Sequence, residues 1–103
     1  MSAATYAVEI PGVGKFVFRR RKMRDQIAIE AETLRITGGE TESDNLRRAA
    51  SSLATLGILT VEAPKGWDLE MVDPLDTDAI AEVLKVFGGL RSAEDEFRLQ
   101  LKS

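Results

Sequence analysis

Histidine and cysteine are both absent from this sequence of 103 residues. Without cysteine there is no disulfide framework and no thiolate nucleophile. Cysteine usage therefore does not indicate whether the protein works in an oxidising or a reducing compartment. Without either residue, a Ser-His-Asp triad and a zinc site built on imidazole or thiolate are excluded. No convergent polar cluster replaces them, so we predict a protein that is not an enzyme, with no catalytic residue, metal site or cofactor.

Long hydrophobic runs are also missing. The longest extend over only a few residues, for example Gly57–Leu59, whereas a membrane span needs about 20 apolar residues. The first ten residues have neither a basic leader nor an apolar stretch, so we expect no signal peptide. These absences predict a cytoplasmic protein that does not contact a membrane.

The remaining composition is that of an ordinary globular protein. Hydrophobic residues make up 44% and charged residues 30% of the chain, which argues against wholesale disorder. A chain of this length is the size of one small domain. We therefore predict a single domain over residues 1–103.

The N-terminal region has the pattern of a β-hairpin. In residues 5–10, Tyr6, Val8 and Ile10 fall on one side of a strand, and residues 15–19 resume this alternation with Phe16 and Phe18. Pro11–Gly14 between the two segments is a strong turn signal. We predict a hairpin over about residues 5–19. An isolated hairpin is marginally stable in water, so it must pack on helices or pair with another chain, and its edges are open to such pairing.

Two helices are predicted in the middle of the chain. The first covers about residues 23–37, because Met23, Ile27, Ala31 and Leu34 recur at helical spacing before the glycine stop Gly38–Gly39. The second covers about residues 44–56, where Asp44 or Ser43 can cap the first turn. Residues 58–61 fit either a short strand or a continuation of this helix.

Two further helices are predicted over about residues 77–87 and 92–101. Gly88–Gly89 interrupts the apolar pattern between them, although a kinked continuation of one helix is the alternative. Together with the hairpin, these elements predict an α+β fold that is mostly α-helical, with the N-terminal β-hairpin packed on three to four helices.

Charge is distributed unevenly along the chain. Residues 1–24 carry a net charge of +5 and residues 62–103 a net charge of −5, and five cations lie in the run Arg19–Arg24. Such a dipolar molecule can associate head to tail or present one charged face to a partner, so we expect a homo-oligomer and take Arg19, Arg20 and Lys22 as candidate partner-binding residues. The alternative is a solvated corner between strand and helix.

The same run raises the question of nucleic-acid binding. A basic cluster beside Phe16 and Phe18 would suit phosphate contacts and base stacking. The isoelectric point of about 5.0 and the need for both phenylalanines in the core count against it. We therefore do not expect nucleic acid as the main partner.

Two other places are candidates for partner contact. Trp67, the only tryptophan, lies in a turn, where it is either an anchor that pins the loop to the core or a hot spot for a partner. Ala49 and Ala50 are small residues on the second predicted helix, and they would let another helix approach closely.

The order of these elements resembles the phage tail assembly chaperones, a diverse family of proteins of about this length encoded in tail-gene clusters of phages and prophages. The segments that carry the resemblance are Phe16–Arg20, Met23–Ile27, Gly38–Gly39, Val61–Asp68 and Glu94–Arg98. The family has no catalytic residues to carry over.

The resemblance implies a non-enzymatic role in the bacterial host cytoplasm. Family members bind the long, helical tape measure protein, keep its apolar surface soluble and help to recruit tail tube subunits, and many also exist in a frameshifted longer form. Two other classes of function stay open. One is a structural virion component, such as a tail-completion or head–tail connector subunit, and the other is a small nucleic-acid-binding regulator.

Overall fold

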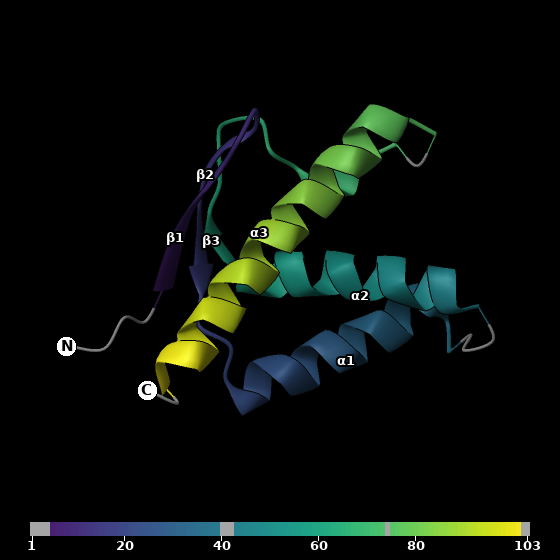
Figure 1. The fold of residues 1–103 in the computed structure, drawn as a ribbon. Coiled ribbons are helices and arrows are strands. Elements are labelled where there is room, and N and C mark those ends of the chain that lie inside the picture. The colour runs from purple at the N-terminus through teal and green to yellow at the C-terminus, as the bar shows by residue number, and fades with distance from the viewer. Residues whose placement is uncertain (1–4, 40–42, 74, 102–103) are drawn as a thin grey trace. The chain divides into compact units, whose positions relative to one another are not determined.

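A computed structural model describes residues 5–39, 43–73 and 75–101 of the chain (Figure 1). It divides into two compact units. We call Met1–Arg20 with Thr60–Ser103 the hairpin unit, and Arg21–Leu59 the helical unit. The expectation of a single domain stays a prediction.

The hairpin unit contains a three-stranded antiparallel sheet with the order β1-β2-β3. Strands β1 (Thr5–Ile10) and β2 (Gly14–Arg19) form the predicted hairpin, with Thr5 opposite Arg19 and Ile10 opposite Gly14. The Val13 N–H donates to the Ile10 carbonyl at 3.0 Å and closes the turn. The short strand β3 (Thr60–Glu62) pairs with β2, so β2 is central and β1 keeps one outer edge.

The core of the hairpin unit is built on the inward face of β2. Phe16 and Phe18 are fully buried, and their rings stack with centroids 5.8 Å apart. Helix α3 (Thr77–Leu101) packs along β1 and adds Val86 and Leu90 to the core. A single turn of 3-10 helix, η1 (Leu69–Met71), lies in the connection before α3.

The prediction of two separate C-terminal helices was wrong, because α3 is one continuous helix through Gly88 and Gly89. The reason is packing. A Cβ atom at Gly89 would overlap Cδ1 of Ile10 and lie 3.4 Å from Cγ1 of Val8, both on β1. Gly89 is therefore the place where the helix comes close to the strand, and the helix tolerates the conformational cost of the two glycines.

The helical unit consists of α1 (Met23–Thr37) and α2 (Asp44–Leu59), which pack against each other. The bounds of α1 are those predicted. It begins where the Lys22 N–H donates to Oδ2 of Asp25 at 2.9 Å, and it ends at Gly38, whose φ of 67° is left-handed. Helix α2 continues three residues beyond the predicted end and leads directly into β3, so residues 58–61 belong partly to each element.

The predicted fold class is confirmed. The protein is α+β and mostly helical, with an N-terminal hairpin and three α-helices in the described residues. None of these helices is both long and apolar enough to cross a membrane.

Candidate functional site

The basic run starts at the end of β2 and continues into the first turn of α1. Cζ of Arg20 lies 4.9 Å from the centroid of the Phe97 ring, which is a cation–π arrangement, and the ring of Tyr6 meets Phe97 edge-on at 6.0 Å. Arg20 therefore helps to fasten the hairpin to the C-terminal half of α3. A substitution there would change packing as well as charge.

The other members of the run differ in their surroundings. In the helical unit, Nη1 of Arg21 donates to Oε1 of Gln26 at 2.7 Å. Arg19, Lys22 and Arg24 are exposed. Of the three predicted partner-binding cations, Arg19 and Lys22 thus present their charge at the surface, while Arg20 is half-buried.

Trp67 is half-buried and acts as an anchor of the loop that precedes η1. Its ring meets Phe16 edge-on with centroids 5.0 Å apart, and its backbone N–H donates to the Pro64 carbonyl at 3.1 Å. The same indole also lines an open cleft of about 320 Å³. The structure is thus compatible with both interpretations of Trp67, anchor and partner contact.

We call this hollow the Trp67 cleft, and all of its lining belongs to the hairpin unit. Its apolar lining comes from the hairpin turn, the loop around η1 and the first turns of α3, and includes Val13, Trp67, Met71, Val72, Ala79 and Val83. Asp68 and Glu82 place carboxylates in the lining, and Lys65 places one cation there. The lining of the cleft is therefore a mixture of apolar and charged side chains.

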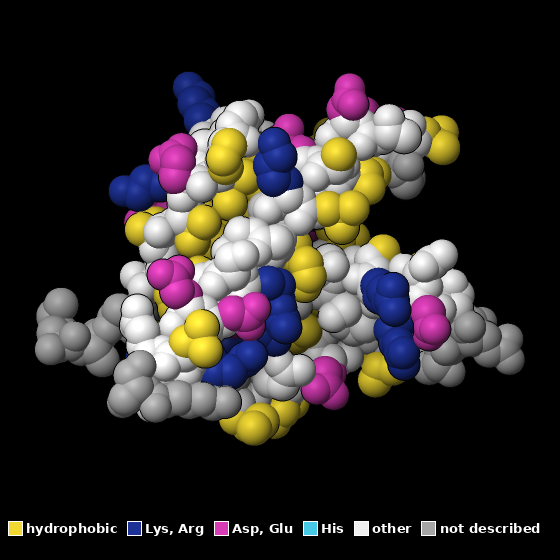
Figure 2. Space-filling view, in the orientation of Figure 1, with side chains coloured by type: hydrophobic (Ala, Val, Ile, Leu, Met, Phe, Trp, Pro, Cys, Tyr) yellow, Lys and Arg dark blue, Asp and Glu magenta, His cyan; other side chains and the backbone are white. Residues whose placement is uncertain are grey.

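The apolar stripe by which α1 was predicted as a helix is exposed. Met23, Ile27 and Leu34 are 74%, 63% and 56% exposed, whereas the buried positions of α1 are Asp25 and Ile29 on the opposite side of the helix. Figure 2 shows hydrophobic side chains at the surface over this helix. The amphipathic pattern is real, but helix α2 does not cover it.

A groove of about 420 Å³ runs between α1 and α2 beside the end of this stripe. Its lining consists of Glu30, Thr33, Leu34, Arg47, Arg48 and Ser51. Leu34 belongs to both the stripe and the groove, so the two surfaces are continuous. The exposed Arg47 and Arg48 supply positive charge along the α2 side.

The two alanines proposed for helix approach have different environments. Ala49 is exposed on α2, while Ala50 is only 1% exposed and belongs to the interior. A partner helix could reach Ala49 but not Ala50 without rearrangement. Neither residue lines the groove between α1 and α2.

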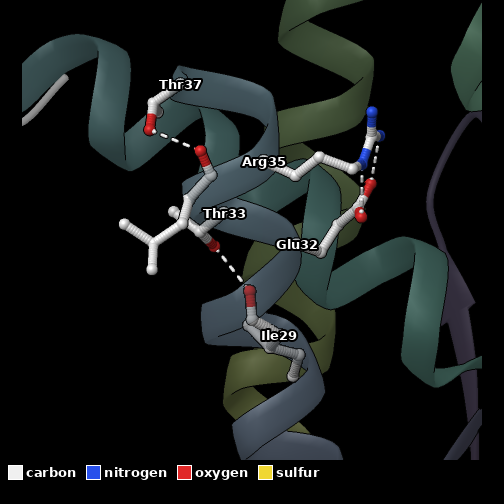
Figure 3. A network of polar contacts seen from close by, with 6 residues as sticks. Ile29, Glu32, Thr33, Arg35 and Thr37 are labelled. Carbon is white, nitrogen blue, oxygen red and sulfur yellow. Dashed lines mark hydrogen bonds and ion pairs between the residues drawn. The ribbon is translucent and has the colours of Figure 1, made fainter. Parts of the chain in front are cut away.

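Polar contacts along α1 keep its charged side chains in place (Figure 3). The guanidinium of Arg35 donates to both carboxylate oxygens of Glu32, from Nε to Oε1 at 2.8 Å and from Nη2 to Oε2 at 2.5 Å. Oγ1 of Thr33 donates to the Ile29 carbonyl at 2.7 Å. The hydrogen bond and charge of Arg35 lower the pKa of the Glu32 carboxyl below its ordinary value.

Replacing Arg35 by methionine is expected to raise the pKa of Glu32 back toward its ordinary value, since the donor and the charge are both lost. A depressed carboxyl pKa contributes stability that is present above the unfolded-state pKa and is lost as the pH falls through the folded-state pKa. The free energy of unfolding of the variant should therefore fall less than that of the wild type as the pH is lowered. NMR titration of the Glu32 carboxyl measures this, with Arg47→Met as the control that leaves Glu32 unchanged; equal pKa values in both variants would contradict it.

In the described ranges 5–39, 43–73 and 75–101, no group of three acidic side chains is arranged to hold a metal ion. Comparison with known proteins gives no relative, since no family model, no curated protein and no solved structure matches this chain. Three surfaces are therefore the candidates for partner contact: the exposed stripe of α1, the groove beside it and the Trp67 cleft.

Proposed function

We propose that this chain is a non-enzymatic phage tail assembly chaperone that binds a helical segment of the tape measure protein. The observation that carries the proposal is the exposed apolar stripe of α1, formed by Met23, Ile27 and Leu34. An amphipathic helix normally turns such a stripe toward a core, and leaving it in water is unfavourable unless a partner covers it.

The geometry of the stripe suits a helical partner. Met23 and Leu34 are separated by 11 positions, which is about 17 Å along the axis at 1.5 Å per residue. Spacings of four and seven residues are those of a short helix–helix seam, in which apolar side chains of the two helices interdigitate. A partner helix with apolar side chains at the same spacing would bury the stripe.

The groove beside the stripe adds a preference of charge. Its lining includes the apolar side chain of Leu34 and, on the α2 side, Arg47 and Arg48. Oδ1 of Asp44 pairs with Arg47 at 3.4 Å, whereas the guanidinium of Arg48 is exposed and can reach a carboxylate of a partner. We therefore expect the bound segment to carry acidic residues on the flank that faces α2.

The double change Ile27→Gln with Leu34→Gln is expected to weaken binding of a tape measure fragment at least about tenfold, because each buried aliphatic side chain contributes about 1.5–3 kcal/mol. Both sites are exposed, so the free energy of unfolding should change by no more than about 0.5 kcal/mol per site. Titration calorimetry measures the affinity, and chemical denaturation measures the stability.

The matched control is Leu84→Gln with Leu99→Gln on α3, since these leucines are 55% and 67% exposed but lie in the hairpin unit. The control should bind the fragment as the wild type does. Equal affinity of all three proteins would reject the stripe as the binding surface. A chaperone should also be absent from finished particles, and its detection there by mass spectrometry would favour a structural virion component.

A further inference from the structure

The Trp67 cleft is bordered by the most acidic part of the chain. The stretch from Asp68 to Glu82 contains six carboxylates and neither lysine nor arginine. Some of these groups serve the backbone, since Oδ1 of Asp76 accepts the N–H groups of Asp78 and Ala79 at the start of α3. Glu70 on η1 and Glu82 in the cleft lining are exposed and have no such task.

Part of the apolar surface at the cleft is open to solvent, although Val83 in the lining is buried. Met71, which lines it, is 78% exposed, and Leu75 in the same connection is 89% exposed. A volume of about 320 Å³ is at the lower end of small-molecule pockets, and the cleft is open rather than enclosed. It therefore suits one or two apolar side chains that project from a basic segment.

The same chain carries a segment with this complementary chemistry. At the start of α1, Met23 and Ile27 are 74% and 63% exposed, and they are flanked by the exposed cations Lys22 and Arg24. This end of α1 combines apolar side chains with positive charge. The cleft combines apolar side chains with the carboxylates of Asp68 and Glu82, which outnumber the one cation among its described lining residues, Lys65.

We propose that the basic start of α1 in one copy docks in the Trp67 cleft of a second copy. Met23 and Ile27 contact the apolar lining, while Lys22 and Arg24 face Glu70 and Glu82. The inference does not rest on the chaperone proposal, because the cleft lies outside the stripe and the groove. The two proposals are nevertheless linked, since a helix bound along the whole stripe would compete for Met23 and Ile27.

The contact is heterologous, because two different surfaces meet. Each copy keeps one unused start of α1 and one unused cleft, so addition continues until a ring closes or a filament grows. Attraction between exposed charges is screened at high ionic strength, so assembly should be strongest at low salt. Trp67, as the only tryptophan, reports on the cleft directly.

The experiment follows the full chain by sedimentation and by Trp67 emission from about 1 to 100 μM, a range that covers ordinary weak association. At low salt, the average mass should rise at least about twofold above 11.3 kDa while the emission changes in parallel, and salt at about 0.5 M should reverse both. A mass that stays monomeric at the highest concentration would overturn the proposal.

Charge reversal tests the pairing of the two surfaces. The cleft variant, Glu70→Lys with Glu82→Lys, and the α1 variant, Lys22→Glu with Arg24→Glu, should each stay monomeric. An equimolar mixture should assemble again, because each reversed surface then finds an opposite charge. Recovery in the mixture also shows that the variants are folded.

The matched control is Asp95→Lys with Glu96→Lys, which makes the same change in net charge on two exposed residues of α3 outside the cleft. It should assemble as the wild type does. Loss of assembly in the control equal to that in the cleft variant, or failure of the mixture to recover, would overturn the proposal. The cleft variant should bind the tape measure fragment at least as tightly as the wild type, because it lacks the contact that competes for Met23 and Ile27. Failure of one proposal can therefore be distinguished from failure of the other.

Discussion

Phe16→Ala is expected to lower the free energy of unfolding by about 3–5 kcal/mol, the range for truncation of a buried aromatic side chain. Phe16 is fully buried, stacks on Phe18 and supports the edge of Trp67. Its loss leaves a cavity under β2 and removes the surface that positions Trp67. This cost is a large part of the stability of a typical domain, about 5–15 kcal/mol.

The measurement is chemical denaturation followed by far-UV circular dichroism, with Trp67 emission recorded in the folded state. The emission should shift to longer wavelength, because the indole loses its apolar neighbour. If the alanine variant does not fold, Phe16→Leu keeps most of the volume and should cost less, about 1.5 kcal/mol or below.

The control is Phe97→Ala, which deletes the same atoms from a half-buried position in the same unit. Phe97 contacts Tyr6 and Arg20, at a different place from Trp67. The control should cost less than half as much and leave the Trp67 emission unchanged. Equal losses in the two variants would show that Phe16 is not the principal support of the hairpin unit.

Local patterns were sufficient to predict the hairpin and the extent of α1. The signals are the turn Pro11–Gly14 and the glycine stop after Thr37. Both act through the backbone conformations that these residues favour, which depend on neighbouring residues alone. The bounds of α2 were less certain because Gly57 has the features of a stop, yet the helix continues through it to Leu59.

The face of α1 that packs could not be predicted in the same way. The stripe of Met23, Ile27 and Leu34 gave the stronger apolar pattern, but the helix buries the side that holds Ile29 and Asp25. A second apolar line is present in Ile29 and Ile36, seven residues apart, of which Ile29 is buried and Ile36 is 37% exposed. When a helix has two apolar lines, one can pack in the protein and the other is available to a partner. The sequence does not show which is which, and the tertiary structure does.

The candidate sites depend on contacts between residues far apart in sequence. Arg20 meets Phe97, and the cleft joins Val13 to Met71 and Glu82. The sequence places Trp67 in a turn and leaves anchor and partner contact open, but it does not show that a cleft opens beside the indole. It also could not separate Ala49 from Ala50, which differ by one position and by their burial.

Gly89→Leu is expected to lower the free energy of unfolding by about 1–3 kcal/mol, because overpacking forces neighbouring groups out of place. Even a Cβ atom there would overlap Ile10, which is 2% exposed and has little room to move. A larger side chain must push α3 away from β1, and the strand would lose its packing on the helix. Thermal or chemical denaturation of the full chain measures the loss.

The neighbouring glycine supplies the matched control. A Cβ atom at Gly88 meets nothing within 4 Å, and the residue is exposed in the same helix. Gly88→Leu should therefore raise the free energy of unfolding by about 0.5–1 kcal/mol, since leucine is a far better helix former than glycine. If the free energy of unfolding rises in Gly88→Leu and falls in Gly89→Leu, the effect at Gly89 is due to close packing on β1 and not to helix propensity. If both variants are stabilised, α3 does not approach β1 closely at Gly89. If both are destabilised, the helix itself requires glycine at both positions, and packing on β1 is not the reason.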